Sequence, residues 1–192
     1  TIAEIDVIDP GRSTEEVAAD VKLRAVLEIT RSLRSSLEPE EILSRIVECV
    51  TQMFPYYSRS YLLRQEETDQ RLVPVAVKQP GDEAEGPVTL QPVALALARQ
   101  VLTQGKAILS VGLPREGQED FSGSVLDDGE RSFMCAPLIG PSKKPVGILY
   151  IETHDEHRRF THEDLELFVC VAILAGQALE QATLFGARYR AV

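Results

Sequence analysis

The sequence predicts an α+β domain whose sheet carries helices from both ends of the chain. Two helical repeats precede the first strand pattern, two hairpin patterns occupy the middle, and a long apolar helix pattern follows the last strand. The predicted order is helix, helix, strand, strand, helix, strand, strand, strand, helix. With 192 residues, 44% of them apolar, the chain can bury one core without needing disulfides or a metal.

The N-terminal region divides into a linker and a connecting helix. Residues 1–12 end in Pro10 and Gly11, and we interpret them as a linker or the end of a preceding domain, so that one domain covers 13–192. Because the chain begins at Thr1, we expect it to be part of a longer protein. Residues 13–36 form a helix whose apolar positions are spaced by three and four, which is typical of a seam between two helices. These positions are Leu23, Val26, Thr30, Leu33 and Leu37.

The next segments predict a helix and a hairpin. A second helix begins at Pro39, where the missing N–H of proline costs no hydrogen bond. Residues 58–64 and 72–78 are rich in Tyr, Leu and Val and flank a polar turn, which indicates a hairpin. Pro74 cannot donate to a neighbouring strand, so the second of these strands is expected at an edge of the sheet.

A third helix and a long loop follow. The helix runs from Pro92 to Gln104 and stops at Gly105, and a short strand covers 106–111. Residues 112–131 are rich in glycine and acidic side chains. A loop of this length in a compact domain is typical of a lid, a binding loop or disorder.

The C-terminal part gives the clearest patterns in the chain. Strands at 132–139 and 146–152 form a hairpin, and Thr161 with Asp164 approximates a capping box at the start of the last helix. The interior of this helix is apolar all round, so we expect it to be covered on more than one side.

Composition excludes several classes of function. The formal net charge is −10 and the pI is about 4.8, which disfavours binding to nucleic acids. No apolar run approaches the roughly 20 residues that would cross a bilayer, so we expect no membrane contact. Three cysteines without C-x-x-C spacing indicate a reducing compartment, and we expect a cytoplasmic location. Cys49, Cys135 and Cys170 have apolar neighbours and are expected to be buried and inert.

No metal, cofactor or catalytic residue is predicted. One cluster has metal-ligand chemistry, and helix N-terminal stabilisation explains its acidic members without a metal. It contains His154, Asp155, Glu156, His157, His162, Glu163 and Asp164. The chain also lacks the sequence motifs of phosphate-binding loops, serine hydrolases and zinc proteases.

The C-terminal half resembles a GAF domain. The resemblance lies in Phe133-Met-Cys-Ala-Pro-Leu138, in Pro145-Val-Gly-Ile-Leu-Tyr-Ile151, and in Phe160-Thr161 with the helix that follows; Leu33–Val50 agrees with the family's first half. The resemblance implies a central antiparallel sheet of five or six strands. It also implies a bundle of terminal helices on one face, and a pocket under a helix and a long loop on the other, as in a PAS- or profilin-like sandwich.

The sequence departs from the better-known GAF subtypes. Phe160 and Asp164 match part of the motif of cyclic-nucleotide-binding members, but Leu165 stands where that motif has Glu, and the chain contains no Asn. No cysteine lies in the long loop, where phytochrome-type members hold a bilin and methionine sulfoxide reductases hold catalytic thiols. These departures point away from cyclic nucleotides, bilins and redox catalysis.

Alternation along 146–152 indicates which residues face a pocket. Gly147, Leu149 and Ile151 are expected to meet the helix bundle, and Val146, Ile148, Tyr150 and Glu152 to face the opposite side. A ligand site needs apolar walls with a few convergent polar groups. The candidates are Tyr150, Ser132, Arg99, Met134, Ile148 and Phe121. Because the long loop is acidic, we expect a neutral or cationic ligand or an empty cleft.

The predicted function is that of a non-enzymatic sensory or regulatory module in a multidomain, bacterial-type signalling protein. Such a module binds a small molecule, dimerises through its terminal helices, or does both, and controls a covalently linked effector domain. One alternative is a ligand-free scaffold that only dimerises. A second is a small redox enzyme of the free methionine sulfoxide reductase type.

Overall fold

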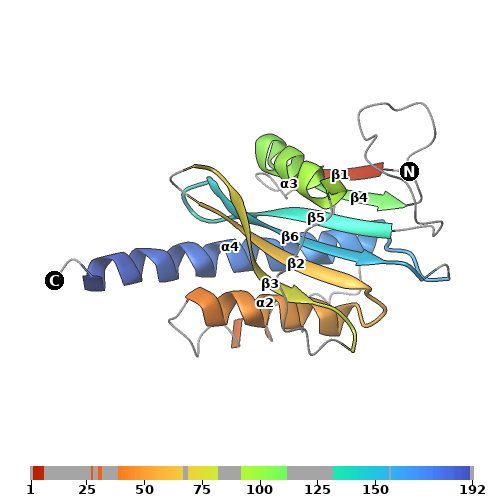
Figure 1. Cartoon of the computed structure of the whole chain (residues 1–192), viewed down its shortest axis with the longest axis horizontal. Coiled ribbons are helices and arrows are strands. Elements are labelled where there is room, and N and C mark those ends of the chain that lie inside the picture. The colour runs from red at the N-terminus through yellow and green to blue at the C-terminus, as the bar shows by residue number, and fades with distance from the viewer. Residues whose placement is uncertain are drawn as a thin grey trace.

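Six strands form one antiparallel sheet through the middle of the molecule (Figure 1). The computed structural model describes residues 2–6, 27, 30, 31, 39–66, 69–81, 92–111, 132–155 and 157–190. Across the sheet the strands are β1 (Ile2–Asp6), β4 (Lys106–Val111), β5 (Ser132–Ile139), β6 (Pro145–Thr153), β2 (Arg59–Gln65) and β3 (Leu72–Lys78). Each neighbouring pair is antiparallel, which confirms the predicted sheet.

For residues 2–6, the first strand corrects the interpretation of residues 1–12 as a linker; residues 7–12 lie outside the described part. Ile2–Asp6 pairs with β4 in the register Ile2 to Ser110 and Asp6 to Lys106, so this segment belongs to the sheet. Its partner lies one hundred or more residues away along the chain. Local alternation carries no information about such a distant pairing, and for this reason the sequence pattern missed the strand.

The helices divide between the two faces of the sheet. Helices α2 (Pro39–Met53) and α4 (His162–Arg190) cover one face, and α3 (Pro92–Gln104) covers the other. Figure 1 shows α4 running along the sheet and continuing past its end toward the C-terminus. None of the helices in the described part combines the length and the apolar character needed to cross a membrane.

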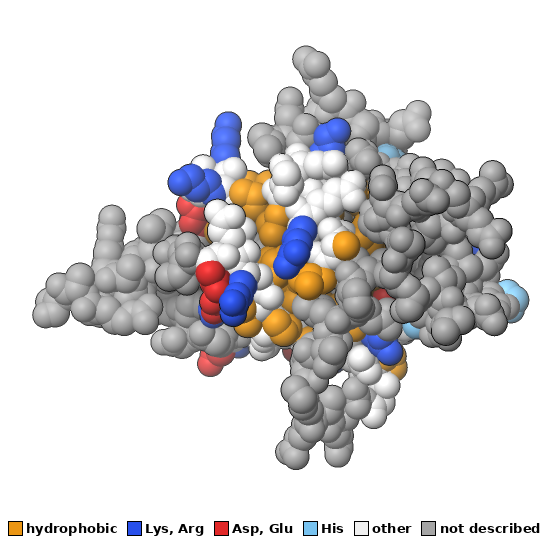
Figure 2. Space-filling model, turned by 45° about the horizontal axis from the view of Figure 1, so that its top comes forward, with side chains coloured by type: hydrophobic (Ala, Val, Ile, Leu, Met, Phe, Trp, Pro, Cys, Tyr) orange, Lys and Arg blue, Asp and Glu red, His pale blue; other side chains and the backbone are white. Residues whose placement is uncertain are grey.

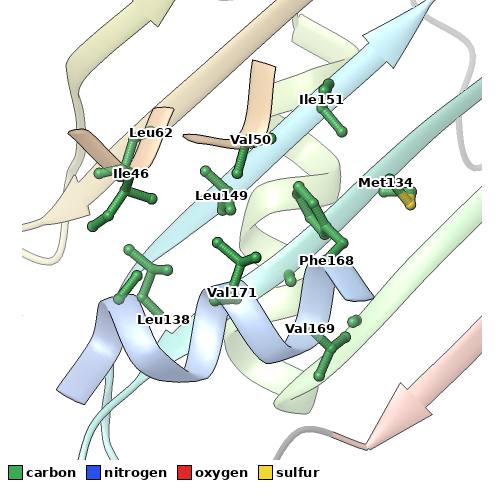
Figure 3. Close-up of a cluster of buried hydrophobic side chains, with 14 of the residues drawn as sticks. Ile46, Val50, Leu62, Met134, Leu138, Leu149, Ile151, Phe168, Val169 and Val171 are labelled. Carbon is green, nitrogen blue, oxygen red and sulfur yellow. The ribbon is translucent and has the colours of Figure 1, made fainter. Parts of the chain in front are cut away.

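The larger core lies between the sheet and the α2–α4 layer. Figure 3 shows side chains from α2, from the strands and from α4 pointing into one another. The rings of Phe54 and Phe160 meet edge to face at 5.6 Å between centroids, and Phe168 lies 6.5 Å from Phe54. Gly176 of α4 lies so close to β5 that a Cβ atom there would stand 2.5 Å from the backbone nitrogen of Ile139. This layer therefore holds α4 tightly against the sheet.

Several local predictions are confirmed. The Asp164 N–H donates to Thr161 Oγ1 at 3.2 Å, and the Thr161 N–H donates to Asp164 Oδ2 at 2.8 Å, which is the expected capping box. Strand β3, which contains Pro74, is an edge strand. Of the predicted connecting helix, the structure describes only Leu27, Thr30 and Arg31, each helical and exposed.

Candidate functional site

Successive residues of β6 face opposite sides of the sheet, as alternation predicts. Leu149 and Ile151 are buried in the core under α2 and α4, whereas Ile148 and Tyr150 are buried in a second cluster with Ala98 of α3. Val146 is an exception, because the pairing of β5 with β6 shifts between Leu138 and Ile139. The extra residue at this bulge turns Val146 toward the α2–α4 core instead of the α3 face.

Two predicted pocket residues lie on the wrong face. Tyr150 stands opposite Cys135 of β5, so these two side chains lie on the same face of the sheet. The residues before and after Cys135 on β5 point to the opposite face. Met134 lies in the core under α2 and α4 (Figure 3). Ser132 is two residues before Met134 on β5, so its side chain faces the same side of the sheet. Ser132 Oγ accepts a hydrogen bond from the Phe160 N–H at 3.1 Å. Neither residue can line a pocket with Tyr150.

The other predicted site residues have different outcomes. Ile148 is buried beside Tyr150 on the α3 face, as expected. Arg99 is exposed on α3, away from the buried side of that helix. Phe121 lies outside the described residues. The same holds for the predicted dimer positions Leu23, Val26, Leu33 and Leu37, and the fifth position, Thr30, is helical and exposed.

A buried carboxylate stands near the end of β6, on the same face of the sheet as Tyr150. Glu152 is 3% exposed, and its Oε2 accepts a hydrogen bond from the Tyr150 hydroxyl at 2.8 Å. Its Oε1 lies 3.2 Å from His154 Nε2 and 3.9 Å from Arg59 Nε. Burying a carboxylate is costly unless donors and opposite charge compensate it, and these three side chains supply both.

Aromatic rings surround this carboxylate because of the strand register. Arg59 of β2 and Phe133 of β5 stand opposite Glu152 on its two sides, and Tyr61 stands opposite Tyr150 in the next row. The Phe133 and Tyr150 rings stack at 5.8 Å between centroids, and the Tyr61 and Tyr150 rings lie 5.7 Å apart. Neighbouring strands are about 4.8 Å apart, so three strands offer a surface of about 10 Å, the size of a small ring compound.

The rim of this cluster reaches the surface. The side chains of Arg59 and His154 are 32% and 34% exposed, above a Glu152 side chain that is 4% exposed. A molecule arriving from solvent therefore meets Arg59 and His154 before the buried carboxylate. Figure 2, in which the top of Figure 1 comes forward, shows hydrophobic side chains next to Lys and Arg side chains among the described residues of that view.

Burial fixes the protonation of the neutral groups in the cluster. It raises the pKa of Tyr150 well above its ordinary value of 10, and the nearby Glu152 carboxylate raises it further. Burial also raises the pKa of Tyr61, while Arg59 lowers it and Glu152 raises it by smaller amounts. Both hydroxyls are therefore hydrogen-bond donors at neutral pH.

The cysteines are only partly as predicted. Cys135 is buried, and burial raises the pKa of its thiol far above the ordinary value, which makes it a poor nucleophile. Cys49 and Cys170 are half-buried, where the sequence predicted burial for all three. Each lies beside the fully buried positions of its helix, so apolar neighbours in sequence did not guarantee a covered side chain.

The histidines do not gather with the acidic residues around one point. His154 contacts Glu152, whereas His162 lies 3.7 Å from Glu166 on α4. Within the described ranges, no group of three or more His, Cys, Asp or Glu side chains is arranged to hold a metal ion.

Five residues of the cluster were not among the predicted site residues: Glu152, Arg59, Tyr61, Phe133 and His154. The alternation of Ser58–Arg64 places Arg59 and Tyr61 on one face, which is a signal that the sequence does contain. What it lacks is the register that sets this face beside Glu152.

Solved structures with the same fold support this architecture. A GAF domain of an Acinetobacter phosphoenolpyruvate-protein phosphotransferase is 18% identical, with a TM-score of 0.65 over 86% of this chain and 96% of that one. The GAF domain of the Escherichia coli potassium sensor histidine kinase KdpD is 18% identical, with a TM-score of 0.55 over 87% and 99%. GAF domains similar to this chain thus occur in signalling proteins.

One similar structure is an enzyme. The free methionine-R-sulfoxide reductase of Neisseria meningitidis, solved with its substrate, is 15% identical, with a TM-score of 0.64 over 89% of this chain and 95% of that one. Identities this low establish the shared fold and nothing more. No functionally curated protein matches the sequence.

The sequence itself also matches a family profile. The profile of the GAF domain covers residues 36–180, well over half of the 192 residues. Together with the six-stranded sheet and its helices, this match identifies the family: the chain belongs to the GAF domains.

Proposed function

We propose that this GAF domain is a sensory or regulatory module that binds a small molecule on the α3 face, at Glu152. In this proposal the bound state controls an effector domain joined to the module in a longer signalling protein. The observation that carries the proposal is the buried Glu152 carboxylate, held by Tyr150, His154 and Arg59 beside stacked aromatic rings. A compensated buried carboxylate at best offsets its own desolvation, so stability alone does not account for placing it here, and a binding role does.

The side chains favour a neutral or cationic ligand with a flat group. An ionised carboxylate only accepts hydrogen bonds, so the ligand must present donors to Glu152. The rings of Phe133 and Tyr150 offer a surface on which a flat or cationic group can lie. The net charge of −10 also works against long-range attraction of an anion.

Ligand binding is tested with a panel that spans these chemistries. Alkylamines, guanidino compounds, free amino acids, nucleobases, cyclic AMP and cyclic GMP are screened by thermal shift, and hits are titrated by calorimetry. We expect a neutral or cationic hit whose affinity falls at least about ten-fold in Glu152→Gln, the loss expected for a charge-assisted hydrogen bond. The matched control is Glu48→Gln, because Glu48 is exposed on α2 and far from the α3 face.

Two outcomes contradict the proposed site. One is a hit whose affinity is the same in Glu152→Gln and Glu48→Gln, which places binding elsewhere. The other is tight binding of cyclic AMP or cyclic GMP that depends on Glu152, which keeps the site and overturns the ligand class.

We further propose that the domain is not an enzyme and works in the cytoplasm. The buried, protonated thiol of Cys135 supports the absence of redox catalysis, and three cysteines that form no disulfide suit a reducing compartment. A turnover assay with free methionine sulfoxide and a thiol reductant tests this directly. Turnover that disappears in Cys135→Ser would establish the redox alternative.

Dimerisation through the terminal helices is a second proposed role. Leu27 is a large apolar side chain with 48% exposure on the helical N-terminal segment, and α4 continues past the sheet. Light scattering is expected to show a dimer that Val26→Asp with Leu33→Asp converts to a folded monomer, because both substitutions put charges into an apolar seam. A monomer in the unmodified chain would exclude this role.

A further inference from the structure

The residue after Glu152 leads from the candidate ligand site to the start of α4. Thr153 is fully buried and, by alternation, faces the α2–α4 side of the sheet. Its Oγ1 donates to the Tyr56 carbonyl oxygen at 2.7 Å and accepts from the Asp155 N–H at 3.2 Å. One side chain thus joins the end of β6 to the turn that follows α2 and to the segment before α4.

A second pair of hydrogen bonds fastens the same turn to β6. The Ser58 N–H donates to the Glu152 carbonyl oxygen at 2.7 Å, and the His154 N–H donates to Ser58 Oγ at 2.9 Å. Glu152 and His154 are the two residues whose side chains meet at the candidate ligand site. A shift of the backbone at this site must therefore move the turn that contains Tyr56 and Ser58.

The turn that contains Tyr56 and Ser58 also contacts the beginning of α4. The Tyr56 and Phe160 rings lie 5.5 Å apart, and the Phe160 N–H is held by Ser132, the residue opposite Thr153 in the sheet. Phe160 directly precedes Thr161, whose capping box with Asp164 starts the helix. We name the set Tyr56, Ser58, Ser132, Thr153 and Phe160 the Thr153 clamp.

We propose that the Thr153 clamp couples the Glu152 site to the first turn of α4, so that a change on the α3 face reaches the helix on the opposite face. The inference rests on the proposed function for its biological meaning, since Glu152 is the proposed ligand contact. The coupling passes through consecutive residues of one strand, whose side chains necessarily point to opposite faces. Helix α4 leads to the C-terminus, so a structural change in its first turn can be carried along the helix.

Hydrogen exchange in a double-mutant cycle tests the coupling without a ligand. The four proteins are the unmodified chain, Glu152→Gln, Thr153→Val and the double variant, and the readout is amide exchange in Leu165–Phe168. We expect Glu152→Gln alone to speed this exchange about five-fold, the effect of weakening one typical hydrogen bond. In the Thr153→Val background, the same substitution should change it less than about two-fold.

A matched cycle provides the control. Thr51 of α2 is also a buried threonine, but its Oγ1 donates within its own helix to the Glu48 carbonyl oxygen and not to the clamp. With Thr51→Val in place of Thr153→Val, the effect of Glu152→Gln is expected to remain about five-fold, because independent sites add. If Thr153→Val does not fold, Ser132→Ala replaces it, because it removes the acceptor of the Phe160 N–H.

Two results overturn the clamp. In one, Glu152→Gln leaves the exchange of the first turn of α4 unchanged in the unmodified chain; in the other, its effect is equal in all backgrounds. The proposed function is judged separately, by ligand titration. If a ligand binds through Glu152 but the exchange effects are additive, the proposed function stands and the clamp is rejected. If the exchange effects are non-additive but no ligand binds, the clamp stands and the proposed function is rejected.

Discussion

The two faces of the sheet are made from alternate residues of the same strands, and they have different contents. On the α2–α4 side, Leu149 and Ile151 are buried among apolar side chains. On the α3 side, Tyr150 and Glu152 bring a hydroxyl and a carboxylate to a comparable depth. Apolar burial stabilises a fold directly, whereas a buried carboxylate at best offsets its own desolvation. The comparison indicates that the α2–α4 face contributes more to the stability of the domain than the α3 face does.

The largest expected difference between the faces concerns two phenylalanines. Phe168→Ala on the α2–α4 side should lower the free energy of unfolding by about 3–5 kcal/mol, because Phe168 is fully buried and leaves a cavity. Phe133→Ala on the α3 side should cost about 1–2 kcal/mol, because Phe133 is only half-buried. Urea denaturation measures both. Equal losses would show that the two faces contribute equally to stability.

The next effect concerns how closely α4 approaches the sheet. Gly176→Ala puts a Cβ atom against the backbone of Ile139, and we expect a loss of about 1–3 kcal/mol from the forced movement of α4. This exceeds the gain of about 1 kcal/mol that alanine brings to a helix interior. Gln177→Ala, at an exposed neighbouring position, is the control and should be neutral or slightly stabilising. A more stable Gly176→Ala protein would contradict the close approach.

A smaller effect tests the polar face. Tyr150→Phe removes the hydroxyl that donates to Glu152 and should cost about 1–2 kcal/mol, because the carboxylate loses one of its donors. Ser142→Ala removes a hydroxyl of the β5–β6 turn that accepts from the Lys144 N–H at 3.3 Å. Because this bond is exposed, water can replace it, and the free energy of unfolding should stay unchanged within about 0.5 kcal/mol. Denaturation at neutral pH compares the two variants. If neither substitution changes the free energy of unfolding, the hydrogen bond between Tyr150 and Glu152 adds nothing to the stability of the fold.

The last prediction concerns alkaline pH. Burial, and then the charge of Asp164, raise the pKa of Tyr56 from 10 to about 12. Because the folded state keeps this proton at higher pH than the unfolded state does, the stabilising contribution is complete below pH 10 and is lost as the pH rises to about 12. Tyr56→Phe should flatten this part of a stability–pH curve. Tyrosine absorbance that titrates entirely near pH 10 would contradict the raised pKa.

The sequence predicted the helices and strands better than it predicted the register between neighbouring strands. The capping box of Thr161 and Asp164 and the edge position given by Pro74 depend on nearby residues, and both were predictable. Alternation along β6 also separated Tyr150 from Leu149 correctly. Alternation within one strand does not give the register with the next, so Ser132 was assigned to the face of Tyr150 when it lies on the other.

Strand β3 at the edge of the sheet has a consequence for self-association. Pro74 has no N–H to offer a neighbouring strand, and the pairing of β2 with β3 shifts beside it, at Leu62 and Leu63. A strand from another molecule that added here would lose a hydrogen bond and meet a distorted ladder. This edge of the sheet therefore resists growth into intermolecular β-structure.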